Sequence, residues 1–111
     1  MTRVLRLMSD WSLWPFYTDL DDGKGYTLTH PDALLEIFPL PADVVRAVLD
    51  WDALYQGILS WDDPQATPWQ RLHENGYYDR GRRVCRQLRE HLPPDVVIDY
   101  RADGEIPPER Y

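Results

Sequence analysis

The alternation of apolar and polar residues predicts β-strands near both ends of the chain. Residues 2–8 are rich in strand-forming side chains, with two arginines interspersed. Residues 95–101 place Val96, Ile98 and Tyr100 on one side of an extended backbone, with Val97 on the other. These two segments are expected to lie side by side in one small sheet.

A loose hairpin is predicted between these strands, formed by residues 12–17 and 26–29. The segment 19–25 is rich in Asp and Gly, which tolerate the positive φ angles of tight turns. Pro15 cannot donate a hydrogen bond to a neighbouring strand. Residues 11–17 are therefore expected to form an edge strand or a packed loop.

Helical spacing of apolar residues predicts a main helix that starts at Pro41, where a missing N–H costs nothing. A short helical turn is expected before it, from His30 to Leu35, because Pro39 and Pro41 prevent a longer helix. The stripe of the main helix that should face the core is Val45, Val48, Asp52 and Tyr55.

A second helical segment is predicted after a loop at 60–68. It starts near Trp69, is interrupted at Asn75-Gly76, and continues to Leu92, where Pro93-Pro94 ends it. Its expected buried stripe is Tyr77, Gly81, Val84, Cys85, Leu88 and Leu92, and its expected outer face carries Arg82, Arg86 and Arg89. An ion pair between Asp79 and Arg83 would support that outer face.

The order of these elements predicts an α+β fold. Its small sheet includes the N- and C-terminal strands, and the two main helices pack on one face. A chain of 111 residues without a linker or an internal repeat is expected to form a single domain over 1–111, with a loose tail at 103–111.

Charge narrows the classes of partner. The net charge is −7, and it is unevenly distributed. Residues 10–63 hold eleven acidic residues against two basic ones, whereas residues 64–92 hold six arginines against three acids. Such a chain repels nucleic acids and anionic membranes, so the arginines are read as a solvated helix face. The acidic half favours either a basic protein partner or simple solubility.

No pattern of residues indicates a catalytic, cofactor or metal site. The chain lacks a Gly-rich phosphate loop and the HExxH, CxxC and GxSxG motifs. The spacing from Asp19 would place Lys24 and His30 where a calcium loop needs Gly and Glu. Cys85 is the sole cysteine and lies on an apolar stripe, so a core role is expected. Without a signal peptide or a long apolar run, the protein is expected to be cytoplasmic.

Acidic and aromatic residues are interleaved in the first sixty-odd positions, a pattern that favours a docking surface. Indole rings can anchor a partner while carboxylates steer a basic one. The candidate anchors are Trp14, Trp51 and Trp61, and the candidate charges are Asp21, Asp22, Asp62 and Asp63. The alternative, that these rings fill a small core, stays open at this point.

The layout resembles that of small, acidic, uncharacterised proteins from GC-rich, actinobacterial-type bacteria. The shared features are the opening strand, Trp14-Pro15, Leu40-Pro41, the WDDP segment from Trp61 to Pro64, Gly81 in the second helix, and the strand from Val96 to Tyr100. In size and charge the chain also resembles immunity proteins and antitoxins. That resemblance implies a non-enzymatic inhibitor that binds a basic toxin.

Three functions are therefore kept open. The first is an immunity or antitoxin-like inhibitor of a basic partner, with no cofactor. The second is an accessory or regulatory subunit of an enzyme, whose interface would be more apolar and permanent. The third is a small enzyme with a site between the sheet and the aromatic segment.

Overall fold

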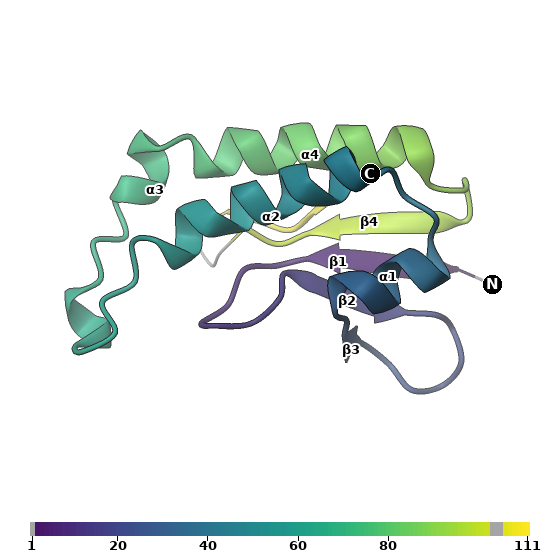
Figure 1. The fold of residues 1–111 in the computed structure, drawn as a ribbon, viewed down its shortest axis with the longest axis horizontal. Helices are drawn as coiled ribbons and strands as arrows, with labels where there is room; N and C mark the ends of the chain where they lie inside the picture. The colour runs from purple at the N-terminus through teal and green to yellow at the C-terminus, as the bar shows by residue number, and fades with distance from the viewer. Residues whose placement is uncertain (1, 103–105) are drawn as a thin grey trace.

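The computed structural model describes residues 2–102 and 106–111. They form one five-stranded sheet with helices packed against it (Figure 1). The strands are β1 (Arg3–Leu7), β2 (Phe16–Asp19), β3 (Thr27–Leu28), β4 (Val96–Tyr100) and β5 (Glu109–Arg110), in the order β3-β2-β1-β4-β5. The helices are α1 (Pro31–Ile37), α2 (Ala42–Gln56), α3 (Arg71–Glu74) and α4 (Tyr77–His91), with a 3-10 turn at Pro64–Ala66. The predicted α+β class is confirmed.

The predicted pairing of the first strand with residues 95–101 is also confirmed, and the pair is parallel. Leu5 lies beside Ile98, with both side chains buried in the core. Two ion pairs link the same segments. Arg3 Nε lies 2.8 Å from Asp95 Oδ2, and Arg6 Nε lies 3.0 Å from Asp99 Oδ2. Because β1 and β4 are adjacent, the central part of the sheet joins sequence-distant parts of the chain.

The predicted hairpin forms, but it is displaced along the chain. β2 begins at Phe16, directly after Pro15, and is antiparallel to both β1 and β3. It is therefore an internal strand, and the expectation of an edge strand was wrong there. Residues before Pro15 form a loop, as the alternative expected. Pro15 is tolerated because it precedes the strand.

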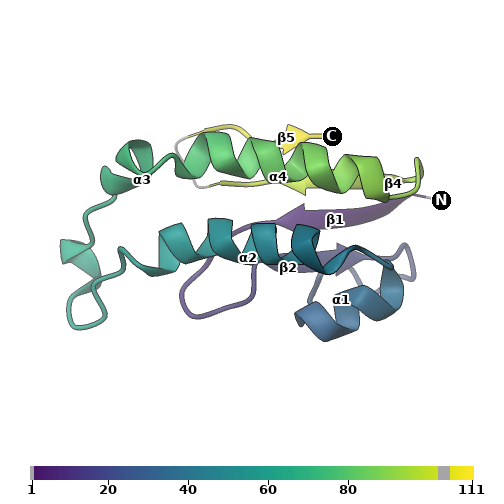
Figure 2. The ribbon, with the colours of Figure 1, turned by 45° about the horizontal axis from the view of Figure 1, so that its top comes forward.

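Helices α2 and α4 lie side by side over one face of the sheet, as predicted (Figure 2). Trp51 of α2 is the largest side chain between them and is 2% exposed. Its ring stacks on Tyr77 with 5.0 Å between centroids, and its indole N–H donates to the Tyr77 carbonyl at 2.9 Å. Aromatic rings therefore make up much of the contact between α2 and α4.

The buried stripe predicted for the second helix is confirmed, because all six of its residues are buried. Burial raises the pKa of the Cys85 thiol to about 12, which keeps it protonated near neutral pH. Gly81 lies directly against Tyr100 of β4. The hydroxyl of Tyr100 donates to the main-chain oxygen of Tyr78 at 3.1 Å, which fastens α4 to the sheet.

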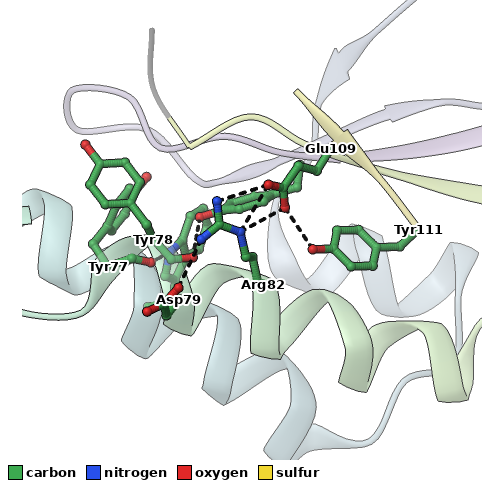
Figure 3. Close-up of polar contacts among 8 residues, drawn as sticks. Tyr77, Tyr78, Asp79, Arg82, Glu109 and Tyr111 are labelled. Carbon is green, nitrogen blue, oxygen red and sulfur yellow. Dashed lines mark hydrogen bonds and ion pairs between the residues drawn. The ribbon is translucent and has the colours of Figure 1, made fainter. Parts of the chain in front are cut away.

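The prediction that Arg82, Arg86 and Arg89 form a solvent-exposed face of the second helix was only partly right. Arg82 lies 3.0 Å from both Glu109 of β5 and Asp79, and the Tyr111 hydroxyl donates to Glu109 at 2.9 Å (Figure 3). Asp79 therefore binds Arg82, one residue before the predicted partner. Arg89 donates to the main-chain oxygens of Leu92, Pro93, Val96 and Tyr111. Arg82 and Arg89 therefore connect α4 to the C-terminal strands, whereas Arg86 is exposed as predicted.

The expectation of a loose tail was wrong for its last residues, while 103–105 lie outside the described residues. β5 pairs with β4, and Ile98 exchanges two main-chain hydrogen bonds with Tyr111, at 2.9 and 3.1 Å. A strand of two residues is too short for a period-2 pattern to reveal, so its contacts with Arg82 and Arg89 could not be foreseen. No helix in the described part of the chain is long and apolar enough to cross a bilayer.

Candidate functional site

The turn and the loop that carry most of the predicted partner-binding residues lie at opposite ends of the molecule (Figures 1 and 2). Asp21 and Asp22 lie on the turn between β2 and β3. Trp61, Asp62 and Asp63 lie on the loop that follows α2. Trp14 is on the β1–β2 loop. The structure does not bring all of these residues into one patch.

The first region, called here the aromatic corner, consists of Trp11, Trp61, Asp62 and Asp63. The rings of Trp11 and Trp61 meet edge to face, with 5.2 Å between centroids. Trp61 is 58% exposed, more than any other large apolar residue that is described. The carboxylate of Asp63 accepts the N–H of Gln65 at 3.2 Å and so begins the 3-10 turn. The exposed ring of Trp61, supported by the partly buried Trp11, and two adjacent carboxylates can bind a partner with both apolar and basic groups.

A buried network fixes the loop that carries Trp11. The Ser9 hydroxyl donates to Asp52 of α2 at 2.7 Å. The side chain of Gln56, one turn later, donates to the Asp10 carbonyl at 2.7 Å and accepts the N–H of Ser12 at 3.2 Å. Burial raises the pKa of Asp52, and hydrogen bonds from Ser9 and Gln56 oppose that shift. The end of α2 therefore sets the position of the β1–β2 loop.

Trp51 was wrongly predicted as a surface anchor. Its ring is enclosed by Tyr77 and Tyr100 in the core. Helical spacing had put Asp52, its neighbour, on the buried stripe, but a helix packed on two sides buries both. The hydrogen bond between Ser9 and Asp52 explains how a carboxylate is accommodated there.

The second region is a groove between α1 and the β2–β3 hairpin, called here the hairpin groove. It encloses about 500 Å³. Its apolar wall comes from Leu20, Leu28, Ala33 and Ile37, and Asp22 and Lys24 lie at its rim. Leu28 is 41% exposed. Sequence reasoning found Asp22 but missed the four apolar residues, because no helical or strand period connects them.

The start of α1 is fastened to β2 at the base of the hairpin groove. The N–H of Thr29 donates to the Phe16 carbonyl at 2.8 Å, and the hydroxyls of Thr18 and Thr29 lie 2.9 Å apart. His30 caps α1 by accepting the N–H of Asp32 at 3.1 Å. Trp14 packs edge to face on His30, with 4.9 Å between ring centroids. Trp14 is thus next to the groove that Asp22 borders.

Charge around the hairpin groove is acidic. Residues 19–37 hold five acidic residues against Lys24, a net charge of −4 with histidine neutral. Asp21 and Asp22 are exposed, and the side chain of Asp32 is 91% exposed. In the described residues no group of three His, Cys, Asp or Glu side chains is arranged to hold a metal ion.

Comparison with known proteins identifies the family of the chain. No curated protein matches the chain. Residues 3–103 match the model of a family described as Serratia CdiI immunity protein-like. The match runs from the first residue of β1 past the end of β4 and includes both candidate regions. The chain therefore belongs to the Serratia CdiI immunity protein-like family.

Proposed function

We propose that the protein is an immunity protein that binds and neutralises a toxic enzyme with a basic surface. The family match over residues 3–103 carries the proposal. Inhibition would occur by binding alone, with carboxylates occupying positions that the phosphates of a substrate would take. The site of action would be the cytoplasm of the cell that makes the protein.

The distribution of exposed side chains supports a protein partner. The large apolar residues that are exposed in the described structure are Leu13, Trp14, Tyr26, Leu28, Leu35, Trp61 and Trp69. All lie between residues 13 and 69, and that stretch contains most of the acidic segment 10–63. Apolar anchors with acidic neighbours are what a basic protein surface requires, since charge speeds encounter and rings slow dissociation.

A direct test uses the toxic domain expected beside this gene, at the C-terminus of a large secreted protein encoded immediately upstream. Production of that domain alone should arrest growth, and co-production of this chain should restore it. Purified partners should bind with an affinity that falls steeply as salt is raised. Growth arrest that persists with this chain present, or binding that salt does not affect, would refute the proposal.

The contribution of the aromatic corner can be measured separately. Changing Asp62 and Asp63 to Asn should slow association by on the order of tenfold and change dissociation less. Asn keeps the side-chain oxygen that caps the 3-10 turn, so folding should be preserved. The control changes Asp43 and Asp50 to Asn. Both are exposed residues of α2, so this pair of substitutions removes the same amount of negative charge from a different part of the surface. Equal effects of the two pairs would exclude a local role for the aromatic corner.

A further inference from the structure

We propose that the hairpin groove is an anchor pocket for a partner segment in which basic residues flank an aliphatic or aromatic side chain. The identity of that partner, a toxin, rests on the proposed function. The chemistry of the pocket rests on the groove itself, so the two can be tested apart.

The interior of the groove offers apolar contact. Leu20 and Leu28 come from the hairpin, and Ala33 and Ile37 come from the side of α1 that faces it. Leu28 and Ala33 are exposed, and the other two are partly exposed. A guest side chain would remove these surfaces from water, which is the driving force for an apolar anchor.

Three of the polar side chains that line the groove, those of Thr18, Thr29 and His30, already have hydrogen-bond partners within the protein. The Thr18 and Thr29 hydroxyls contact each other, and the Thr29 hydroxyl also donates to the Thr27 carbonyl at 2.8 Å. The Nδ1 atom of His30 accepts the N–H of Asp32. A small polar ligand needs several unsatisfied groups to orient it. This arrangement favours an apolar side chain instead.

The acidic residues around the groove would select the charge of the guest, because the two charged residues that line the groove itself, Asp22 and Lys24, balance each other. Asp22 borders the groove and Asp21 precedes it on the same turn, while Asp32 and Glu36 lie on α1. Lys24 is the sole cation in the segment from residue 19 to 37. Basic residues on either side of the anchor would therefore be attracted, and acidic ones repelled.

The pocket is preformed, which lowers the entropic cost of binding. Hydrogen bonds between Thr29 and both Phe16 and Thr18 hold α1 to the sheet, and Trp14 packs on His30 beside them. A peptide should therefore find the groove in the free protein.

The first experiment needs no toxin. The ¹⁵N-labelled protein is titrated with three capped tripeptides: Arg-Phe-Arg, Arg-Ala-Arg and Glu-Phe-Glu. We expect Arg-Phe-Arg alone to shift the amide signals of Thr27, Leu28, Ala33 and Ile37. The proposal is overturned if these signals do not move, or if either of the other peptides moves them equally.

The second experiment blocks the groove. Ala33→Trp fills it, whereas Leu35→Trp adds the same ring at an exposed position of α1 that does not line it. We expect Ala33→Trp to abolish the peptide shifts and to weaken binding of the toxic domain at least tenfold, mainly through faster dissociation. Leu35→Trp should change affinity less than twofold. Leu28→Ala, which removes part of the apolar wall, provides a second variant with an expected loss of severalfold.

The outcomes separate the two proposals. Wild-type affinity for the toxic domain in Ala33→Trp and Leu28→Ala would overturn the anchor pocket while leaving the immunity function intact. Selective binding of Arg-Phe-Arg without any binding of the toxic domain would uphold the pocket and overturn the proposed function.

Discussion

Helix α4 approaches the sheet so closely at Gly81 that a methyl group there has no space. An added Cβ would lie 2.7 Å from Cε1 of Tyr100 and would overlap its Cζ and hydroxyl oxygen. The ring is 1% exposed, and its hydroxyl is bonded to the Tyr78 carbonyl. Tyr100 cannot move aside without disturbing the core or breaking that bond, so Gly81→Ala should destabilise the protein.

The expected magnitude comes from three effects on the free energy of unfolding. Forcing a methyl group into a packed core costs about 1–3 kcal/mol. Loss of the hydrogen bond from Tyr100 costs about 1 kcal/mol more. Alanine regains about 1 kcal/mol over glycine in a helix interior. We therefore expect a net loss of about 2 kcal/mol, which lowers the melting temperature by roughly 10 °C in a domain of this size.

Urea and thermal denaturation followed by circular dichroism measure this change. Gln87→Ala, at an exposed position of the same helix, serves as the control and should alter stability by less than about 0.5 kcal/mol. In a Tyr100→Phe background the cost of Gly81→Ala should fall, because the overlapping hydroxyl is gone. If Gly81→Ala matches or exceeds wild-type stability, the close approach of α4 to β4 is wrong.

Three further predictions concern other contacts. Trp51→Ala should cost about 3–5 kcal/mol in denaturation experiments because the ring is in the core. Trp61→Ala should leave the melting temperature within a few degrees of the wild-type value. Comparable losses of stability in the two variants would contradict the assignment of Trp51 to the core and of Trp61 to the surface. Arg89→Ala should cost about 1–3 kcal/mol in urea, since it removes the hydrogen bonds from Arg89 to the main-chain oxygens of Leu92, Pro93 and Val96. Arg86→Ala is the control, and an equal loss of stability in that variant would exclude this explanation. Arg82 lowers the pKa of Glu109, so the stabilisation from this carboxylate is present above its ordinary pKa and is lost as the pH falls through the lower, folded-state pKa. Glu109→Gln should therefore be less stable than wild type at neutral pH, and the gap should close in acid; a gap independent of pH would refute the linkage.

Local periodicity was enough to predict the main helices and the strands β1 and β4. The stripe on α4 follows the helical repeat over fifteen residues, so every position in the predicted stripe is buried, although buried Tyr78 was missed. The break at Asn75-Gly76 was predicted because an Asn-Gly pair ends helices, and the structure places Gly76 in the left-handed region with a φ of 78°. These features depend on residues near each other in the chain.

Features that depend on distant contacts could not be predicted in this way. Arg82 and Arg89 have the spacing of an exposed face, and only the arrival of β5 gives Arg82 its partner Glu109. Trp51 is a residue type that often anchors a partner, and its burial becomes evident only once α4 packs against it. The hairpin groove is likewise assembled from two elements whose sequences carry no common pattern.

The division between buried and exposed rings explains how so small a protein can present a binding surface. A domain of this length has room for one core and little else, and Trp51, Tyr77 and Tyr100 occupy it at the α2–α4 contact. The loops at the ends of the molecule are not enclosed by this core, and they are where we propose that a partner binds. The loop that carries Trp11 has no core of its own, so α2 supplies its rigidity through the side chains of Asp52 and Gln56. The buried carboxylate of Asp52 therefore helps to position the exposed ring of Trp61. Loss of the hydrogen bond between Ser9 and Asp52 would make the β1–β2 loop more mobile, and this loop holds Trp11 against Trp61.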